Sequence, residues 1–151
     1  MPLKLPGELD HIEQLVSFFE VEILGAKTTW TDVSGLAIEV GVVDQAVSGP
    51  KGDTIIKKVM GTTTYGDITL KRNLSADKTF YTWAHQVAKG GMGFRKDGSI
   101  VVFMSDGTEA GRWTFTMAFP KKWSVSDLDV GSDDPMVEEV TLAIESLERV
   151  K

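Results

Sequence analysis

Cysteine is absent from this chain of 151 residues, and histidine occurs only twice. The lack of cysteine excludes disulfides, thiolate metal sites and a catalytic cysteine, and it fits a protein made in a reducing cytoplasm. No apolar run approaches the roughly 20 residues that a transmembrane helix needs. The first residues also lack the apolar stretch and the cleavage site of a signal peptide. We therefore expect cytoplasmic assembly and no direct membrane insertion.

The usual constellations of catalysis and cofactor binding are also missing. Neither His11 nor His85 has a nucleophile and an orienting carboxylate beside it, as a catalytic triad requires. The glycines at 90–93 depart from the G-x-G-x-x-G pattern at Lys96. Residues 127–138 match a calcium loop in carboxylate count, but Gly131 stands where an oxygen ligand is needed, so an acidic surface loop is favoured. No catalytic, cofactor-binding or metal-binding residue is predicted, and we do not expect an enzyme.

The composition is that of one soluble globular domain covering residues 1–151. Hydrophobic residues make up 42% and charged residues 25% of the chain, which are ordinary shares for such a domain. The net charge of −6 argues against a protein that binds nucleic acid through broad contacts to the phosphate backbone.

The segment 111–123, GRWTFTMAFPKKW, has a strict alternation of apolar and polar residues. One face receives Trp113, Phe115, Met117 and Phe119, and the other receives Arg112, Thr114 and Thr116. Successive side chains of a strand point to opposite faces, so this pattern predicts a strand in a sheet with one apolar and one polar face. Pro120 is expected to end the strand.

Further extended segments are expected on both sides of this strand. The predicted strands are 18–24, 30–43 with a bend or bulge at Gly35, 55–60, 68–72 and the central strand 100–104. Asp97-Gly98 and Asp106-Gly107 are predicted hairpin turns, and residues 48–53 are a loop by composition. The last segment, 137–147, fits a helix and a strand equally well by periodicity.

One helix is predicted, over residues 76–89. Ser75 is a suitable N-cap, Asp77 would lie in the first turn, and Gly90 is a suitable stop. An apolar stripe at helical spacing predicts packing against the core and consists of Phe80, Trp83, Ala84 and Val87.

In order and spacing, several segments resemble the tail tube proteins of contractile phages and of phage-derived contractile injection systems. The resemblance extends over residues 18–150, nearly the whole chain. Its segments are 18–23 (FFEVEI), 32–36 (DVSGL), 65–72 (YGDITLKR), the helix around Trp83, 95–100 (RKDGSI), 112–115 (RWTF), 118–123 (AFPKKW) and 144–149 (IESLER).

The resemblance implies a mainly β fold: two antiparallel sheets packed as a small barrel with one flanking α-helix, similar to type VI secretion tube proteins. It also implies that the last segment is a strand. Residues 1–16 fall outside the clear match and are expected to form an N-terminal arm or a short helix. Subunits of such families form hexameric rings that stack into an inner tube.

The same resemblance implies the partners. They are further copies of the chain, a contractile sheath protein, and the baseplate, tube-initiator and terminator proteins. Effectors or DNA would pass through the lumen, and the particle would be a phage tail or a phage-tail-like structure that can be released from the cell. Loop residues Gly49, Lys51, Gly52 and Asp53 are candidates for contact with the next ring. Glu39, Thr69, Lys71 and Thr141 are candidates for facing the lumen.

Two other functions stay open at the level of sequence. A virion tail that passes DNA has the same expected fold as an effector-loaded tube. A small monomeric β-barrel that binds an apolar ligand would instead need an interior cavity and would be a monomer of 16.5 kDa.

Overall fold

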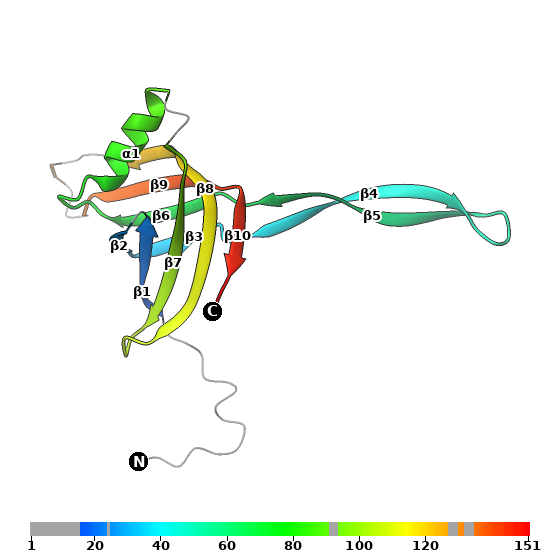
Figure 1. Cartoon of the computed structure of the whole chain (residues 1–151), viewed down its shortest axis with the longest axis horizontal. Coiled ribbons are helices and arrows are strands. Elements are labelled where there is room, and N and C mark those ends of the chain that lie inside the picture. The colour runs from blue at the N-terminus through cyan, green and yellow to red at the C-terminus, as the bar shows by residue number, and fades with distance from the viewer. Residues whose placement is uncertain (1–15, 24, 91–93, 127–129, 132–134) are drawn as a thin grey trace, which may run out of the picture.

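The computed structural model describes residues 16–23, 25–90, 94–126, 130–131 and 135–151. It contains a small barrel, one helix against the barrel, and a long hairpin that projects far beyond both (Figure 1). The elements are β1 (Val16–Ile23), β2 (Ala26–Trp30), β3 (Asp32–Ser34), β4 (Ile38–Ser48), β5 (Thr54–Tyr65), β6 (Ile68–Asn73), α1 (Thr79–Ala88), β7 (Lys96–Met104), β8 (Glu109–Val125), β9 (Val137–Ala143) and β10 (Ser146–Arg149).

The barrel is a single antiparallel path of strands that returns to its start. The order is β2-β1-β7-β8-β9-β6-β3, with β10 paired to β8 beside this path. Only Thr31 separates β2 from β3, and its backbone N–H donates to the carbonyl of Lys71 on β6 at 3.0 Å. One bent segment therefore joins the two ends of the path, and the predicted fold class is confirmed.

Strand β8 belongs to both halves of the barrel. Its first half pairs with β7 and β10, and its second half pairs with β9. The change occurs at Met117, which has a φ of +52° and donates its N–H to Asp97 Oδ1 at 2.9 Å. The left-handed conformation shifts the alternation by one residue, so Ala118 is buried while Met117 is 42% exposed.

Three expectations for this strand are therefore wrong. Met117 and Phe119 do not lie on the apolar face, because the shift places Ala118 between them in the core. Pro120 does not end the strand, which continues to Val125. Proline is tolerated because the register with β9 shifts between Pro120 and Lys122, and a bulge leaves room for a residue without an N–H donor. Trp113 and Phe115 do face the core as predicted.

The two Asp-Gly pairs have different roles. Asp106-Gly107 makes the β7–β8 turn, where Gly107 has a φ of +86° and donates to the Met104 carbonyl at 2.9 Å. Hydrogen bonds from Thr108 lower the pKa of Asp106 in this turn. Asp97-Gly98, predicted as a turn, instead lies within β7. A Cβ at Gly98 would lie 2.6 Å from Phe115 Cζ, so close packing across the sheet requires the glycine.

The predicted strand 30–43 is divided into parts of β2, β3 and β4. The break between β3 and β4 begins at Gly35, which has a φ of +87° and lies so close to Asp67 that a Cβ would stand 1.8 Å from the Asp67 carbonyl oxygen. The predicted bend at Gly35 is confirmed. The next predicted strand, 55–60, is longer than expected because β5 continues through Gly61 to Tyr65. The ambiguous last segment forms the strands β9 and β10.

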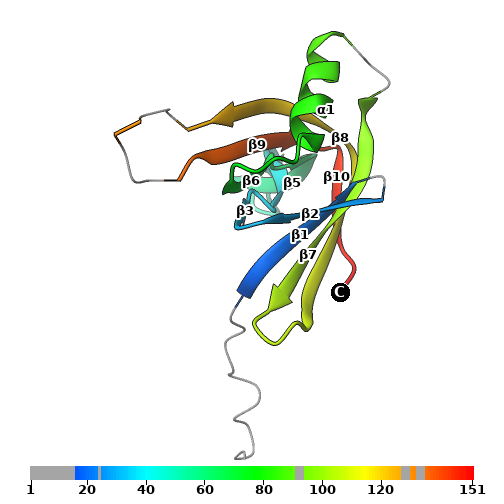
Figure 2. The ribbon, with the colours of Figure 1, turned by 90° about the vertical axis from the view of Figure 1, so that its left-hand side faces the viewer.

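Helix α1 is shorter than predicted and begins three residues later. Ser75 is not its N-cap; the Asp77 carboxylate accepts hydrogen bonds from Thr79 N at 3.0 Å and Thr79 Oγ1 at 2.6 Å. These bonds, with a smaller contribution from Arg72, lower the pKa of Asp77. Phe80 and Trp83 are buried as predicted, and Phe80 meets the Trp30 ring edge-on at 5.0 Å. The helix therefore lies across one end of the barrel (Figure 2).

Large apolar side chains fill the barrel, but one ion pair is also buried. Arg72 Nε donates to Glu138 Oε2 at 3.0 Å, and Trp123 Nε1 donates to Glu138 Oε1 at 2.9 Å. Glu138 is 1% exposed and thus does not belong to an acidic surface loop. Residues 127–129 and 132–134 of that predicted loop lie outside the described residues, as do residues 1–15 of the predicted N-terminal arm or helix.

Candidate assembly surfaces

The hairpin β4–β5, here called the arm, pairs with no other strand among the described residues. Its tip is a tight turn in which Gly49 N donates to the Asp53 carbonyl at 2.6 Å and Gly52 N donates to the Gly49 carbonyl at 3.1 Å. Gly52 takes a φ of +77°, which favours glycine. The four candidates for ring-to-ring contact, Gly49, Lys51, Gly52 and Asp53, therefore lie together at the far end of the arm (Figure 1). Their role in contact stays a prediction.

Apolar side chains are exposed on both faces of the arm. Val42 pairs with Met60 on one face, and the next pair, Val43 with Val59, lies on the opposite face. Met60 is 85% exposed and Val43 is 56% exposed. The other exposed apolar residues of the arm are Ile38, Val40, Ile55 and Ile56. Exposed apolar side chains gathered in this way mark an interaction site, and a lone two-stranded hairpin is at best marginally stable in water.

Glycines produce a bulge near the root of the arm. Val40 pairs with Thr63 while Val42 pairs with Met60, so Gly41 alone opposes Gly61 and Thr62. The backbones approach so closely that a Cβ at Gly61 would lie 3.0 Å from the Gly41 carbonyl oxygen. A bulge increases the local twist of a hairpin, and the twist of the arm is visible in Figure 1.

The structure groups three of the four predicted lumen residues and separates the fourth. Thr69 on β6 lies directly opposite Thr141 on β9, and Lys71 lies two residues further along the outer face of the same pair of strands. Lys71 Nζ is 3.9 Å from Glu139 Oε2. Glu39 lies on the arm, opposite Thr64. The lumen-facing role of all four stays a prediction.

A second polar face covers the sheet formed by β1, β7, β8 and β10. The strand register aligns Glu22, Ser99, Thr114 and Glu148 in one row across this sheet. The sequence indicated a polar face on residues 112–116, but it did not indicate that the glutamates of β1 and β10 join it. Their alternation within the segments 18–24 and 144–149 was the available signal.

Three strands of the barrel have a free edge. Within the described residues, β10 pairs only with β8, β2 only with β1, and β3 only with β6. Unpaired backbone donors and acceptors at such edges are templates for pairing with another chain. The barrel interior, by contrast, is filled by side chains such as Trp30, Phe80 and Phe115, each at most 1% exposed.

In the described part of the chain no helix is both long and apolar enough to cross a membrane. Among the same residues there is no cluster of three or more His, Cys, Asp or Glu side chains that could hold a metal ion.

Free strand edges and an arm with exposed apolar side chains on both faces are features of a protein that associates with other chains. The chain belongs to the T4-like virus tail tube protein gp19 family, whose model matches residues 17–148. This family is one of structural tube proteins, and the predicted family and the role of a tube subunit are confirmed. A comparison with curated proteins found no match.

Solved structures show the same fold. The chain is 21% identical to a chain of the sheath–tube complex of an extracellular contractile injection system, PVC, in its extended state; the match covers 98% of each chain with a TM-score of 0.78. It is 24% identical to a chain of the PVC sheath/tube terminator, covering 88% of this chain and 93% of that one with a TM-score of 0.72. Hcp1 from Flavobacterium johnsoniae is 16% identical, with coverage of 89% and 95% and a TM-score of 0.55.

Proposed function

We propose that this protein is the repeating subunit of the inner tube of a contractile injection apparatus, forming hexameric rings that stack inside a sheath. The observation that carries the proposal is the arm, whose apolar side chains are exposed on both faces in the single subunit. An arm of this kind is stabilised when other subunits cover both faces, because burial removes apolar surface from water.

The free edges of β2 and β10 support closure into a ring. Pairing of the β10 edge of one subunit with an edge strand of its neighbour would satisfy the exposed backbone groups, and a closed ring leaves no edge unpaired. The polar rows on β1, β7, β8 and β10 would then face a wet channel, as the polar interiors of channel-forming barrels do.

The length of the arm supports contact between rings. An 11-residue strand such as β4 spans about 36 Å at roughly 3.3 Å per residue, which carries the tip well beyond the barrel. The tip residues Lys51 and Asp53 would meet the adjacent ring. Assembly would take place in the cytoplasm, with a sheath around the stack and with a baseplate and a terminator at its ends. Sheath contraction would then drive the tube and its cargo of effectors or DNA.

Negative-stain microscopy of the purified protein tests the proposal. Rings or hollow rods are the expected result, and a protein that stays strictly monomeric at high concentration would contradict it and favour the small ligand-binding barrel. The neighbouring genes distinguish a virion tail from an injection system. Capsid and terminase genes beside this one would indicate a virion tail.

A second test addresses the tip of the arm. The double substitution Lys51→Glu with Asp53→Lys reverses two exposed charges and leaves the turn glycines in place. We expect correctly folded subunits whose rings do not stack, as judged by circular dichroism and microscopy. Tubes of ordinary length would reject contact between the tip and the next ring.

A further inference from the structure

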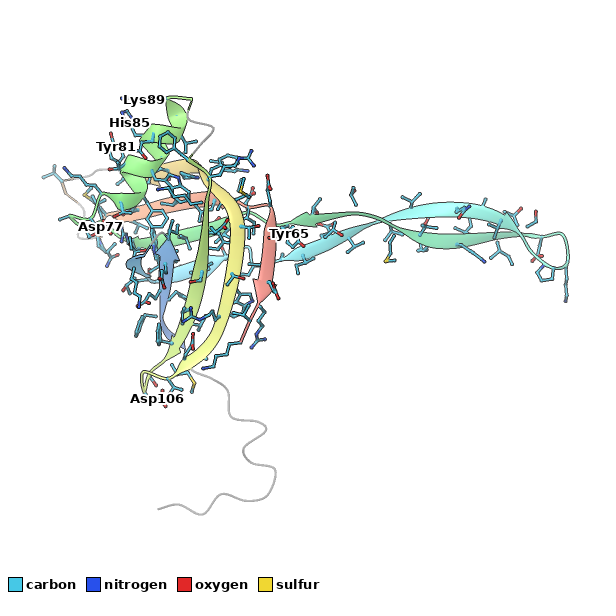
Figure 3. The ribbon with its side chains drawn as sticks, viewed as in Figure 1. Tyr65, Asp77, Tyr81, His85, Lys89 and Asp106 are labelled. Carbon is cyan, nitrogen blue, oxygen red and sulfur yellow. The ribbon has the colours of Figure 1, made fainter. Side chains whose placement is uncertain are left out.

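A groove of about 450 Å³ runs between α1 and the second half of β8. Its lining consists of Tyr81, Ala84, His85, Val87 and Ala88 from α1 and residues 119–123 from β8. Tyr81, His85 and Lys89 follow one another along the exposed side of the helix (Figure 3). The proposed ring and ring-to-ring contacts use neither of these elements: they assign the β2 and β10 edges and the arm.

The aromatic part of the groove is held in place by the protein itself. Trp123 is fixed through its Nε1 hydrogen bond to the buried carboxylate of Glu138, and its ring meets Tyr81 edge-on at 5.0 Å. The Tyr81 ring in turn stacks on His85 with centroids 5.9 Å apart. Tyr81 is nevertheless 45% exposed, so a pre-formed apolar surface remains open to solvent.

The charge in this groove is positive although the chain as a whole carries −6. Lys121 and Lys122 belong to the lining, and none of the described lining residues is a carboxylate. Lys121 is paired with Asp67 at 2.5 Å, whereas Lys122 has no ion-pair partner within the described residues. The groove on the other side of α1 differs, because Asp77 accompanies Lys78 and Lys96 there. An acidic partner is therefore favoured at the first groove alone.

We propose that the groove between α1 and β8 binds an acidic, partly apolar segment of the contractile sheath protein. The inference rests on the proposed function, since it assigns the sheath contact of the tube. The arm of a second copy is a poorer occupant because its charges cancel: residues 38–65 contain Glu39, Asp44 and Asp53 against Lys51, Lys57 and Lys58. The arm also leaves the barrel on the side away from α1 (Figure 1).

The chemistry of the groove suits a contact that must break. Exposed charge pairs are screened by salt, with a Debye length of about 10 Å at 0.1 M. A sheath held through Lys122 and its neighbours would therefore be released from the tube by moderate salt. Apolar contact with Tyr81 and Trp123 would set the register of the segment, because such anchors need a shaped pocket.

Photo-crosslinking of sheathed tubes tests the occupant directly. The chain is produced together with its sheath protein, with p-benzoylphenylalanine replacing Tyr81 in one sample and Thr82, which lines the other groove, in the control. A crosslink from position 81 to the sheath protein, absent from position 82, is expected. A crosslink from position 81 to a second copy of this chain, or no crosslink, would overturn the proposal.

Charge reversal tests the chemistry. Lys122→Glu should lower the amount of sheath retained per tube at least tenfold at 0.1 M NaCl, while Lys122→Arg and the control Lys78→Glu should leave it unchanged. Retention by Lys122→Glu equal to that of the unaltered protein would overturn the inference. The number of tubes in every sample is counted before the amount of retained sheath is measured. Absence of tubes from the unaltered protein would count against the proposed function, whereas tubes with undiminished sheath would count against the groove alone.

Discussion

Arg72 and Glu138 lie directly opposite each other on β6 and β9, and their side chains form a hydrogen-bonded ion pair inside the barrel. The guanidinium of Arg72 also lies 4.4 Å from the centroid of the Trp30 ring and reaches Asp77 before α1 at 3.4 Å. Through Trp123 the same carboxylate is bonded to β8. One buried pair thus connects strands from several parts of the barrel with the start of the helix.

Removal of the buried carboxylate charge should strongly destabilise the protein. The substitution Glu138→Gln leaves Arg72 charged and buried, which costs about 3–5 kcal/mol in the free energy of unfolding. Urea unfolding followed by tryptophan fluorescence measures the loss. The matched control is Glu139→Gln, since Lys71 lies 3.9 Å from Glu139 at the surface and such pairs contribute about 1 kcal/mol or less. Equal losses in the two variants would contradict the assigned role of the pair.

The left-handed conformation at Met117 predicts an unusual order of substitutions. Met117→Gly should be neutral or stabilising by up to about 1 kcal/mol, because only glycine adopts a positive φ without steric cost. Met117→Val should destabilise by about 1–2 kcal/mol, since a β-branched side chain tolerates this conformation poorly. Thermal unfolding gives the order. Thr114→Val, on the same strand, should change stability little, and a glycine variant less stable than the valine variant would refute the prediction.

The lowered pKa of Asp77 predicts a dependence of stability on pH. A carboxyl with a lower pKa in the folded state stabilises the fold above its usual pKa of 3.8, and the contribution disappears as the pH falls through the folded pKa. The side chain is 38% exposed, so the contribution at neutral pH is modest, about 1 kcal/mol.

The variant Asp77→Asn provides the measurement for this carboxyl. Its free energy of unfolding should be lower than that of the unaltered protein at pH 7, and the difference should shrink toward zero well below pH 3.8. A difference that stays constant with pH would show that the ionised form of Asp77 contributes nothing.

Because apolar side chains are exposed on both faces of the arm, we predict that each face is required for tube formation. Met60→Glu and Val43→Glu place a charge on opposite faces, and burial of an unpaired charge is strongly unfavourable. Each variant should abolish tubes in the microscope while changing the unfolding free energy of the subunit by about 0.5 kcal/mol or less. The control is Gln86→Glu, on the surface of α1. Normal tubes from either arm variant would show that its face stays in water.

The sequence predicted much of the fold because alternation reports directly on which face a strand buries. The apolar residues Trp113 and Phe115 lie inside as expected. The prediction failed at Met117, because a single positive φ shifts the alternation and depends on the Asp97 side chain from another strand. It failed at Gly98 because a glycine needed for close packing looks the same in sequence as one needed for a turn.

The assembly surfaces were less accessible from the sequence. Apolar alternation in 30–43 looked like an ordinary half-buried strand, and only the structure shows that Val42 and Val43 are both exposed. Periodicity describes faces, and it does not say whether anything covers them. Likewise, the pairing of Thr69 with Thr141 depends on strands far apart in the chain. The groove between α1 and β8 combines residues from both elements, so no single segment of the sequence indicates it.

The ion pair between Asp44 and Lys58, at 2.9 Å, separates the apolar pairs of the arm into two short patches. Charged residues within an apolar hairpin act against non-specific association and fibril formation, because burying the edge or face that carries them requires desolvation of the charges. A subunit must remain dissolved until it meets a growing end. This pair, midway along the arm, therefore favours solubility of the free subunit and slightly weakens the contacts of the arm after assembly.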